Sequence, residues 1–135
     1  MSTLALDVGG TKLAVGVVDD SGVLRHRAQA PTPRADADTI WAVAEALLTE
    51  ALAAVDTVDA VGIASAGPID VPAGTVSPIN IVGWQGFPIV SRVAELTGAA
   101  VRLGGDGLCM ALGEQWRGAA TEARFLLGMV VSTGV

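Results

Sequence analysis

The chain has 135 residues, of which 51% are hydrophobic, and its 14 acidic and 8 basic side chains give a formal net charge of −6. This length suits one domain with a sizeable core, and the acidic charge argues against nonspecific binding to nucleic acids or anionic membranes. The single cysteine excludes an intrachain disulfide framework and a cysteine-only zinc site. Every apolar run is interrupted well before about 18 residues, and the N-terminus lacks a signal-peptide pattern. We therefore expect a cytoplasmic domain without a transmembrane helix.

The N-terminal part of the chain predicts three consecutive strands, at residues 3–8, 12–19 and 23–30. The first two are compact runs of apolar residues, and the turns Gly-Gly-Thr and Asp-Ser-Gly separate the three strands. Connections this short predict an antiparallel meander.

The rest of the chain predicts helices that alternate with strands. Residues 39–55 carry apolar side chains at helical spacing, and Asp38 is the expected N-cap. The later elements are a strand at 58–64, a small hairpin at 69–76, a helix at 87–97 that Gly98 ends, a strand at 100–103, a helix at 106–117 and a strand at 125–132.

This order of elements predicts an α/β domain with a mixed sheet of five-stranded type and helices on its faces. The order is that of the ribonuclease-H-like core of actin-like ATPases. A Rossmann fold would begin strand-helix-strand, with its glycine-rich loop opening a helix. Here Gly9 and Gly10 precede a strand, which argues against a Rossmann fold.

The turn Asp-Val-Gly-Gly-Thr-Lys after the first strand is the first candidate site. The strand delivers the Asp7 carboxylate, and Gly9 and Gly10 lack the Cβ atoms that would keep a phosphate away from the backbone N–H groups. Thr11 adds a hydroxyl, Lys12 is the only lysine of the chain, and a carboxylate at this place can hold Mg²⁺. An ordinary hairpin turn with a solvated lysine is the alternative.

Two further segments could line a ligand pocket. The segment VGIASAGPID ends a strand with small residues and a break at Gly67, which leaves room for a ligand but is also typical of a tight turn. The segment SPINIVGW contains Asn80, whose amide offers the donor and the acceptor that vicinal sugar hydroxyls need. Trp84 could face a sugar, although packing in the core is the favoured interpretation.

Asp106 follows a predicted strand and opens a predicted helix within the segment Gly-Gly-Asp-Gly. A helix N-terminus favours an ionised carboxylate, and an exposed carboxylate can accept a proton from a substrate hydroxyl. A simple helix cap is the alternative. Near the end of the sequence, the last predicted strand runs into Ser-Thr-Gly, where Thr133 and Gly134 would begin a second phosphate-contacting turn.

Five segments in order, across residues 4–135, resemble the ROK family of bacterial sugar kinases and sugar-responsive repressors. These segments are LALDVGGTKLAVGVVD, VGIASAGPID, NIVGW, GGDGLCMALGEQWRGA and VVSTGV. The sequence looks most like the actinobacterial glucokinase-like members. The resemblance implies an actin-like ATPase fold of two domains that close over a hexose. Residues 1–135 would be its N-terminal domain, expected to be inactive or very weak without the C-terminal domain.

The resemblance also implies roles for residues of this sequence. The first phosphate motif is matched by Asp7, which would hold Mg²⁺, and by Gly9, Gly10, Thr11 and Lys12. The second phosphate motif would begin at Thr133 and Gly134. Positions that line the sugar pocket are matched by Gly67, Asn80 and Asp106, and Asp106 matches the catalytic base.

The cofactors that the resemblance implies are ATP and Mg²⁺, with a structural zinc only in the C-terminal domain. The implied activity is ATP-dependent phosphorylation of a hexose, in a glucokinase-like reaction. The implied partners are the hexose and ATP, with neither nucleic acid nor membrane, and the full-length protein is expected to form a homo-oligomer.

One departure from the family pattern keeps other functions open. The family usually has Glu-Asn-Asp-Ala-Asn where residues 104–108 read Gly-Gly-Asp-Gly-Leu. Gly105 cannot supply the sugar hydrogen bond of the family Asn, a loss on the order of 1–3 kcal/mol. A catalytically silent sugar- or nucleotide-binding module is therefore one alternative. A sugar-responsive ROK regulator is another, disfavoured because such repressors carry a DNA-binding winged helix before the motif that here begins at Asp7.

Overall fold

A computed structural model describes residues 1–130 of the chain. Its helices and strands are β1 (Ser2–Val8), β2 (Lys12–Asp19), β3 (Leu24–Pro31), α1 (Ala37–Ala53), β4 (Ala60–Ser65), β5 (Ile69–Asp70), β6 (Thr75–Val76), α2 (Ile89–Thr97), β7 (Ala100–Gly105) and α3 (Asp106–Arg117). Five strands form one mixed sheet in the order β3-β2-β1-β4-β7, and β5 and β6 form a separate hairpin. The predicted ribonuclease-H-like arrangement is confirmed.

The sheet combines an antiparallel meander with a parallel half. The strand pairs β1–β2 and β2–β3 are antiparallel, as their short turns predict, while β1–β4 and β4–β7 are parallel. Helix α1 connects β3 to β4, and α2 precedes β7, so each parallel pair is joined by a helical crossover. Because the parallel strands β1, β4 and β7 are neighbours, their carboxyl ends lie along one edge of the sheet.

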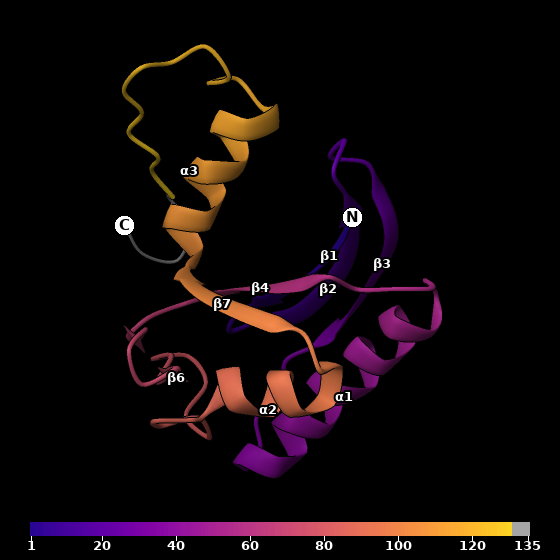
Figure 1. Ribbon diagram of the computed structural model, residues 1–135. Coiled ribbons are helices and arrows are strands. Elements are labelled where there is room, and N and C mark those ends of the chain that lie inside the picture. Colours follow the sequence, from indigo (N-terminus) through magenta and orange to yellow (C-terminus); the bar gives the residue numbers. More distant parts are fainter. Residues whose placement is uncertain (131–135) are drawn as a thin grey trace.

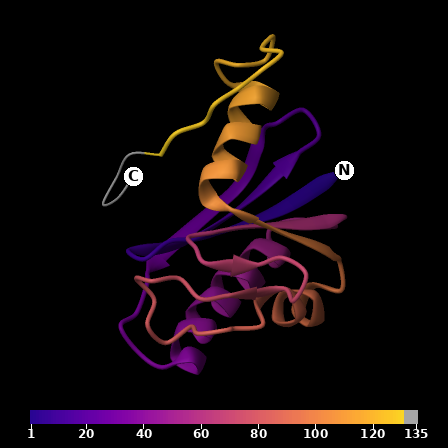
Figure 2. The same cartoon turned by 90° about the vertical axis from the view of Figure 1, so that its left-hand side faces the viewer.

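One face of the sheet carries the hydrophobic core. Helices α1 and α2 both cover this face, whereas α3 projects from the opposite side (Figures 1 and 2). Side chains alternate between the two faces of a strand, and the inward apolar ones of β1 and β4 are large and at most 1% exposed. They are Leu4, Leu6, Val8, Val61 and Ile63.

The opposite face of the sheet carries small side chains. A cavity of about 520 Å³ lies over this face, beside α3. Among its lining residues are Ala5, Ala14, Gly16, Gly62 and Ala64. None of the residues of α3 is buried. Asp7 follows the same alternation and belongs to this face, which places its carboxylate on the side from which α3 rises.

The first helix begins earlier than the sequence pattern predicts. The sequence predicts Asp38 as the N-cap, but Asp36 is the cap, and its Oδ1 accepts a hydrogen bond of 2.9 Å from the backbone N–H of Thr39. An N-cap side chain accepts from the N–H two or three residues after it, and Asp36 meets this spacing with Thr39. Asp38 instead lies in the first turn, where its negative charge suits the helix dipole.

The predicted strand at residues 125–132 is wrong over its described part. Residues 125–130 adopt no strand, and 131–132 lie outside the described residues. This segment passes α3 rather than a sheet edge, since a Cβ on Gly128 would lie 2.5 Å from the Ala111 Cβ. A strand needs an adjacent edge for its hydrogen bonds, and α3 offers none. Phe125 and Leu127 are accordingly 94% and 85% exposed.

Within residues 1–130, no helix has the length and apolar character needed to cross a membrane.

Candidate active site

A cavity of about 1020 Å³ opens where the parallel strands β1, β4 and β7 end. Ligands of α/β proteins commonly bind at this edge of a sheet. The cavity brings together seven of the residues that the sequence predicts for the site: Asp7, Gly9, Gly10, Thr11, Lys12, Asn80 and Asp106. Three segments far apart in the sequence therefore meet in one place.

Asp7 and Asp106 are the two acidic residues of the cavity. The register pairs Asp7 of β1 with Ala64 of β4, and Ala64 in turn with Gly104 of β7, so Asp106 follows two strands away from Asp7. The protein atoms around the Asp7 carboxylate raise its pKa above the ordinary value of 3.8, and the charge of Asp106 acts in the same direction while Lys12 opposes both. The negative charges of Asp7 and Asp106 therefore repel each other in the cavity.

The turn between β1 and β2 is held from both sides. The backbone N–H of Gly9 donates to the Lys12 carbonyl at 3.1 Å, and a Cβ on Gly9 would lie 3.0 Å from that same oxygen, so a larger residue would crowd the turn. Thr32 holds the turn from outside: its Oγ1 donates to the Gly9 carbonyl at 2.7 Å and its N–H donates to the Thr11 carbonyl at 3.0 Å. Thr32 is not among the predicted site residues, because no local sequence pattern gives a signal for it.

Asn80 lies against this turn. A Cβ on Gly10 would be 2.6 Å from the Asn80 Cβ, so the absence of a side chain at Gly10 is what allows the two loops to touch. Asn80 is exposed and lines the cavity, where its amide is available to a ligand.

Gly67 does not line this cavity. Its carbonyl accepts a hydrogen bond of 3.3 Å from the N–H of Ile79, and the carbonyl of Pro68 accepts one of 2.9 Å from Ser77. In the structure Gly67 supports the loop that carries Asn80, and its predicted place in the lining of the sugar pocket stays a prediction. A turn closed by backbone hydrogen bonds and a pocket wall have the same small-residue sequence pattern.

Asp106 is the first residue of α3, after the N-cap position of Gly105. Its Oδ1 accepts a hydrogen bond of 2.7 Å from the N–H of Gly107, which holds the carboxylate at the start of the helix, and the side chain is exposed toward the cavity. This position suits a proton acceptor that a substrate must be able to reach.

Trp84 belongs to the core. It is fully buried, stacks on Phe87 with ring centroids 4.3 Å apart, and its Nε1 donates to the Ala37 carbonyl at 3.2 Å. The favoured interpretation from the sequence is confirmed, and this ring offers no face to a ligand. The predicted phosphate-motif residues Thr133 and Gly134 lie outside the described residues.

The family model described as "ROK family" matches residues 3–135. The chain belongs to the ROK family. Its similar relatives include an N-acetyl-D-glucosamine kinase of Citrobacter koseri, 33% identical over 129 residues, and an N-acetylmannosamine kinase of the same organism, 38% identical over 136 residues. These alignments cover 96% and 100% of this ROK chain but 43% and 46% of the relatives, so the chain spans less than half of their length.

Solved structures of ROK proteins share the fold. A ROK hexokinase from Thermus thermophilus matches with a TM-score of 0.82 and 35% identity, over 90% of this chain and 41% of that one. A ROK family glucokinase from Streptomyces griseus, in complex with glucose and AMPPNP, matches with a TM-score of 0.78 and 35% identity, over 88% of this chain and 38% of that one.

The cavity of this ROK chain brings together a glycine turn, one lysine and two carboxylates. A Cβ would lie 3.0 Å from the Lys12 carbonyl oxygen at Gly9 and 2.6 Å from the Asn80 Cβ at Gly10, so both positions favour glycine. Lys12 adds a positive charge beside this turn. Within residues 1–130 no three His, Cys, Asp or Glu side chains group to hold a metal ion. A lone carboxylate such as Asp7 fits Mg²⁺, which takes one or two protein carboxylates and completes its shell with phosphates and water.

Proposed function

We propose that the full-length protein transfers a phosphoryl group from ATP to a hexose or an N-acyl hexosamine, and that residues 1–135 form the N-terminal domain of this kinase. The observation that carries the proposal is the meeting of Asp7, the Gly9–Lys12 turn, Asn80 and Asp106 in one cavity. Similar proteins are named as an N-acetyl-D-glucosamine kinase, an N-acetylmannosamine kinase and a glucokinase. These names support the same substrate class.

Each of these residues then has a distinct task. Asp106 accepts the proton of the sugar hydroxyl that attacks the phosphorus atom, and Asn80 holds sugar hydroxyls beside it. The N–H groups of the Gly9–Lys12 turn and the Lys12 ammonium bind phosphate oxygens, and Asp7 holds Mg²⁺. ATP with Mg²⁺ supplies the phosphoryl group when bound. Since phosphoryl transfer depends mainly on positioning and charge neutralisation, this small set of groups suffices on one side of the site.

The test uses the full-length protein with MgATP and a panel of glucose, mannose, N-acetylglucosamine and N-acetylmannosamine. We expect phosphate transfer to at least one sugar, and a kcat lower by roughly 10²–10⁴-fold in Asp106→Asn, because the proton acceptor is lost. Asp56→Asn, an exposed acidic residue outside the cavity, is the matched control. Transfer to none of the sugars, or an unchanged kcat in Asp106→Asn, would overturn the proposal. Sugar binding without transfer would instead identify a silent binding module.

A further inference from the structure

The cavity has a second wall, which contains none of the predicted site residues. The connection from β3 to α1 contributes Pro33, Arg34 and Ala35 to it, and the loop that follows Asn80 contributes Val82 and Gly83. Arg34 is the one arginine that lines this cavity within the described chain.

The short segment that carries Arg34 is anchored at both ends. On one side, Thr32 makes its two hydrogen bonds to Gly9 and Thr11 of the phosphate-binding turn. On the other side, Asp36 caps α1 through the N–H of Thr39. Arg34 lies between these anchors, so its backbone position is set by the same turn that forms the candidate phosphate cradle.

The opposite loop packs closely against this segment. A Cβ on Gly83 would lie 2.5 Å from the Ala35 carbonyl oxygen and 2.8 Å from the Cδ1 of Ile40. Because Gly83 follows Asn80 by only three residues, the loop that presents Asn80 and the segment that presents Arg34 are held together. Both Asn80 and Arg34 line the cavity.

The Arg34 guanidinium has no acidic partner among residues 1–130. The arginines that form ion pairs there are Arg25, with Asp19, and Arg92, with Asp38. Arg34 is exposed and lines the cavity, so its donors are available to a ligand. The other residues of this wall, which are Pro33, Ala35, Val82 and Gly83, carry no charge and no polar side chain.

We propose that Arg34 is a specificity residue that donates hydrogen bonds to the carbonyl oxygen of an N-acyl group on the sugar. An N-acyl group presents one acceptor oxygen next to a methyl group, which suits a wall with one cationic donor among apolar side chains. An unsubstituted hexose has no such pair of groups at that position. This inference rests on the proposed function. It assigns the N-acyl hexosamines to that same site as its substrate class.

The experiment compares N-acetylmannosamine with mannose, and N-acetylglucosamine with glucose, on the full-length protein. We expect Arg34→Ala to raise KM for the N-acetyl sugars at least tenfold, as the loss of a charged hydrogen bond predicts, with kcat and the KM for the parent sugars within about twofold. Arg34→Lys retains a charge but not the planar fork, so it should restore part of the preference. Arg124→Ala, an exposed arginine outside the cavity, is the control.

The outcomes separate this inference from the proposed function. Equal changes for the N-acetyl and parent sugars, or no change for either, would refute the role of Arg34 while leaving the kinase function intact. If no sugar is phosphorylated, the proposed function fails, and dissociation constants from calorimetry with the same four sugars test Arg34 independently. A wild-type protein that binds the parent sugar as well as its N-acetyl derivative would also refute the inference.

Discussion

Gly10 and Asn80 touch across the candidate site, and a Cβ on Gly10 would lie only 2.6 Å from the Cβ of Asn80. Gly10 belongs to the turn between β1 and β2, while Asn80 belongs to the loop after β6. The contact joins the candidate phosphate-binding turn to the residue proposed to hold the sugar. A change at Gly10 therefore acts on both parts of the site.

Gly10→Ala should displace the loop that carries Asn80, because the added methyl group has no space. Overpacking of this kind costs about 1–3 kcal/mol of unfolding free energy, and we expect a higher KM for the sugar in the full-length protein. Urea unfolding and steady-state kinetics measure the two effects. Gly113→Ala is the control, since its Cβ meets no atom within 4 Å and lies in α3. Equal behaviour of the two variants would contradict the proposed contact.

Asp7→Asn should stabilise the protein at pH 7 in the absence of ligands. The pKa of Asp7 is raised above 3.8 in the folded state, so the folded protein holds this proton more tightly than the unfolded chain. Stability then falls as pH rises through the folded pKa, and Asn removes that loss. Thermal unfolding from pH 3 to pH 7 should show a gain in melting temperature of Asp7→Asn over the wild type at neutral pH. This gain should shrink as the pH falls toward 3.8. A gain that is the same at every pH would speak against this explanation. The variant should also lose Mg²⁺-dependent activity.

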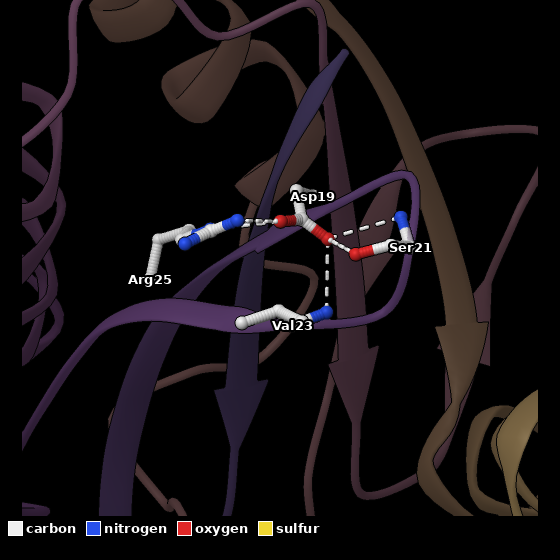
Figure 3. A network of polar contacts seen from close by, with 4 residues as sticks. All are labelled: Asp19, Ser21, Val23 and Arg25. Atoms are coloured by element: carbon white, nitrogen blue, oxygen red, sulfur yellow. Dashed lines mark hydrogen bonds and ion pairs between the residues drawn. The ribbon is translucent and has the colours of Figure 1, made fainter.

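Asp19 should stabilise the turn between β2 and β3 above pH 3.8 (Figure 3). Its Oδ1 accepts hydrogen bonds from the hydroxyl of Ser21 at 2.6 Å and from the N–H of Val23 at 2.9 Å, and its Oδ2 lies 2.6 Å from the Arg25 guanidinium. These contacts, with Ser21 first, hold the pKa of Asp19 well below 3.8 despite an opposing effect of burial.

A lowered pKa gives stability that is present above the unfolded value of 3.8 and is lost as pH falls toward the folded pKa. Asp19→Asn should therefore unfold at a lower temperature than the wild type at pH 7, with a difference that narrows below pH 3.8. Asp20→Asn, its exposed neighbour in the same turn, is the control in the thermal melts. A difference that persists unchanged at pH 2 would show that charge is not the cause.

Trp84→Ala should lower the unfolding free energy by about 3–5 kcal/mol, because the ring is fully buried and its removal leaves a cavity. The change also leaves the Ala37 carbonyl without its hydrogen bond from Nε1. Trp116→Ala is the matched control, since that ring is 52% exposed, and surface substitutions usually change stability by about 0.5 kcal/mol or less. Urea titrations monitored by circular dichroism distinguish the two. Similar losses in both variants would contradict the assignment of Trp84 to the core.

The sequence by itself determined the elements whose signals are local. The apolar runs and short turns predict the meander of β1, β2 and β3, and Gly98 ends α2 in the left-handed conformation, with φ of 67°. The family motif at residues 7–12 also needs no structure to be seen. Such signals depend on neighbours along the chain, which periodicity and turn chemistry describe.

Only the tertiary structure decided which of these residues meet. It places Asn80 against Gly10, makes Gly67 a support for the loop, and adds Arg34 and Thr32 to the site. In the tertiary structure, residues 125–130 form no strand, because α3 and not a sheet edge lies beside that segment. Strand pairing and loop packing join residues from opposite ends of the sequence, and no pattern within a short window contains that information.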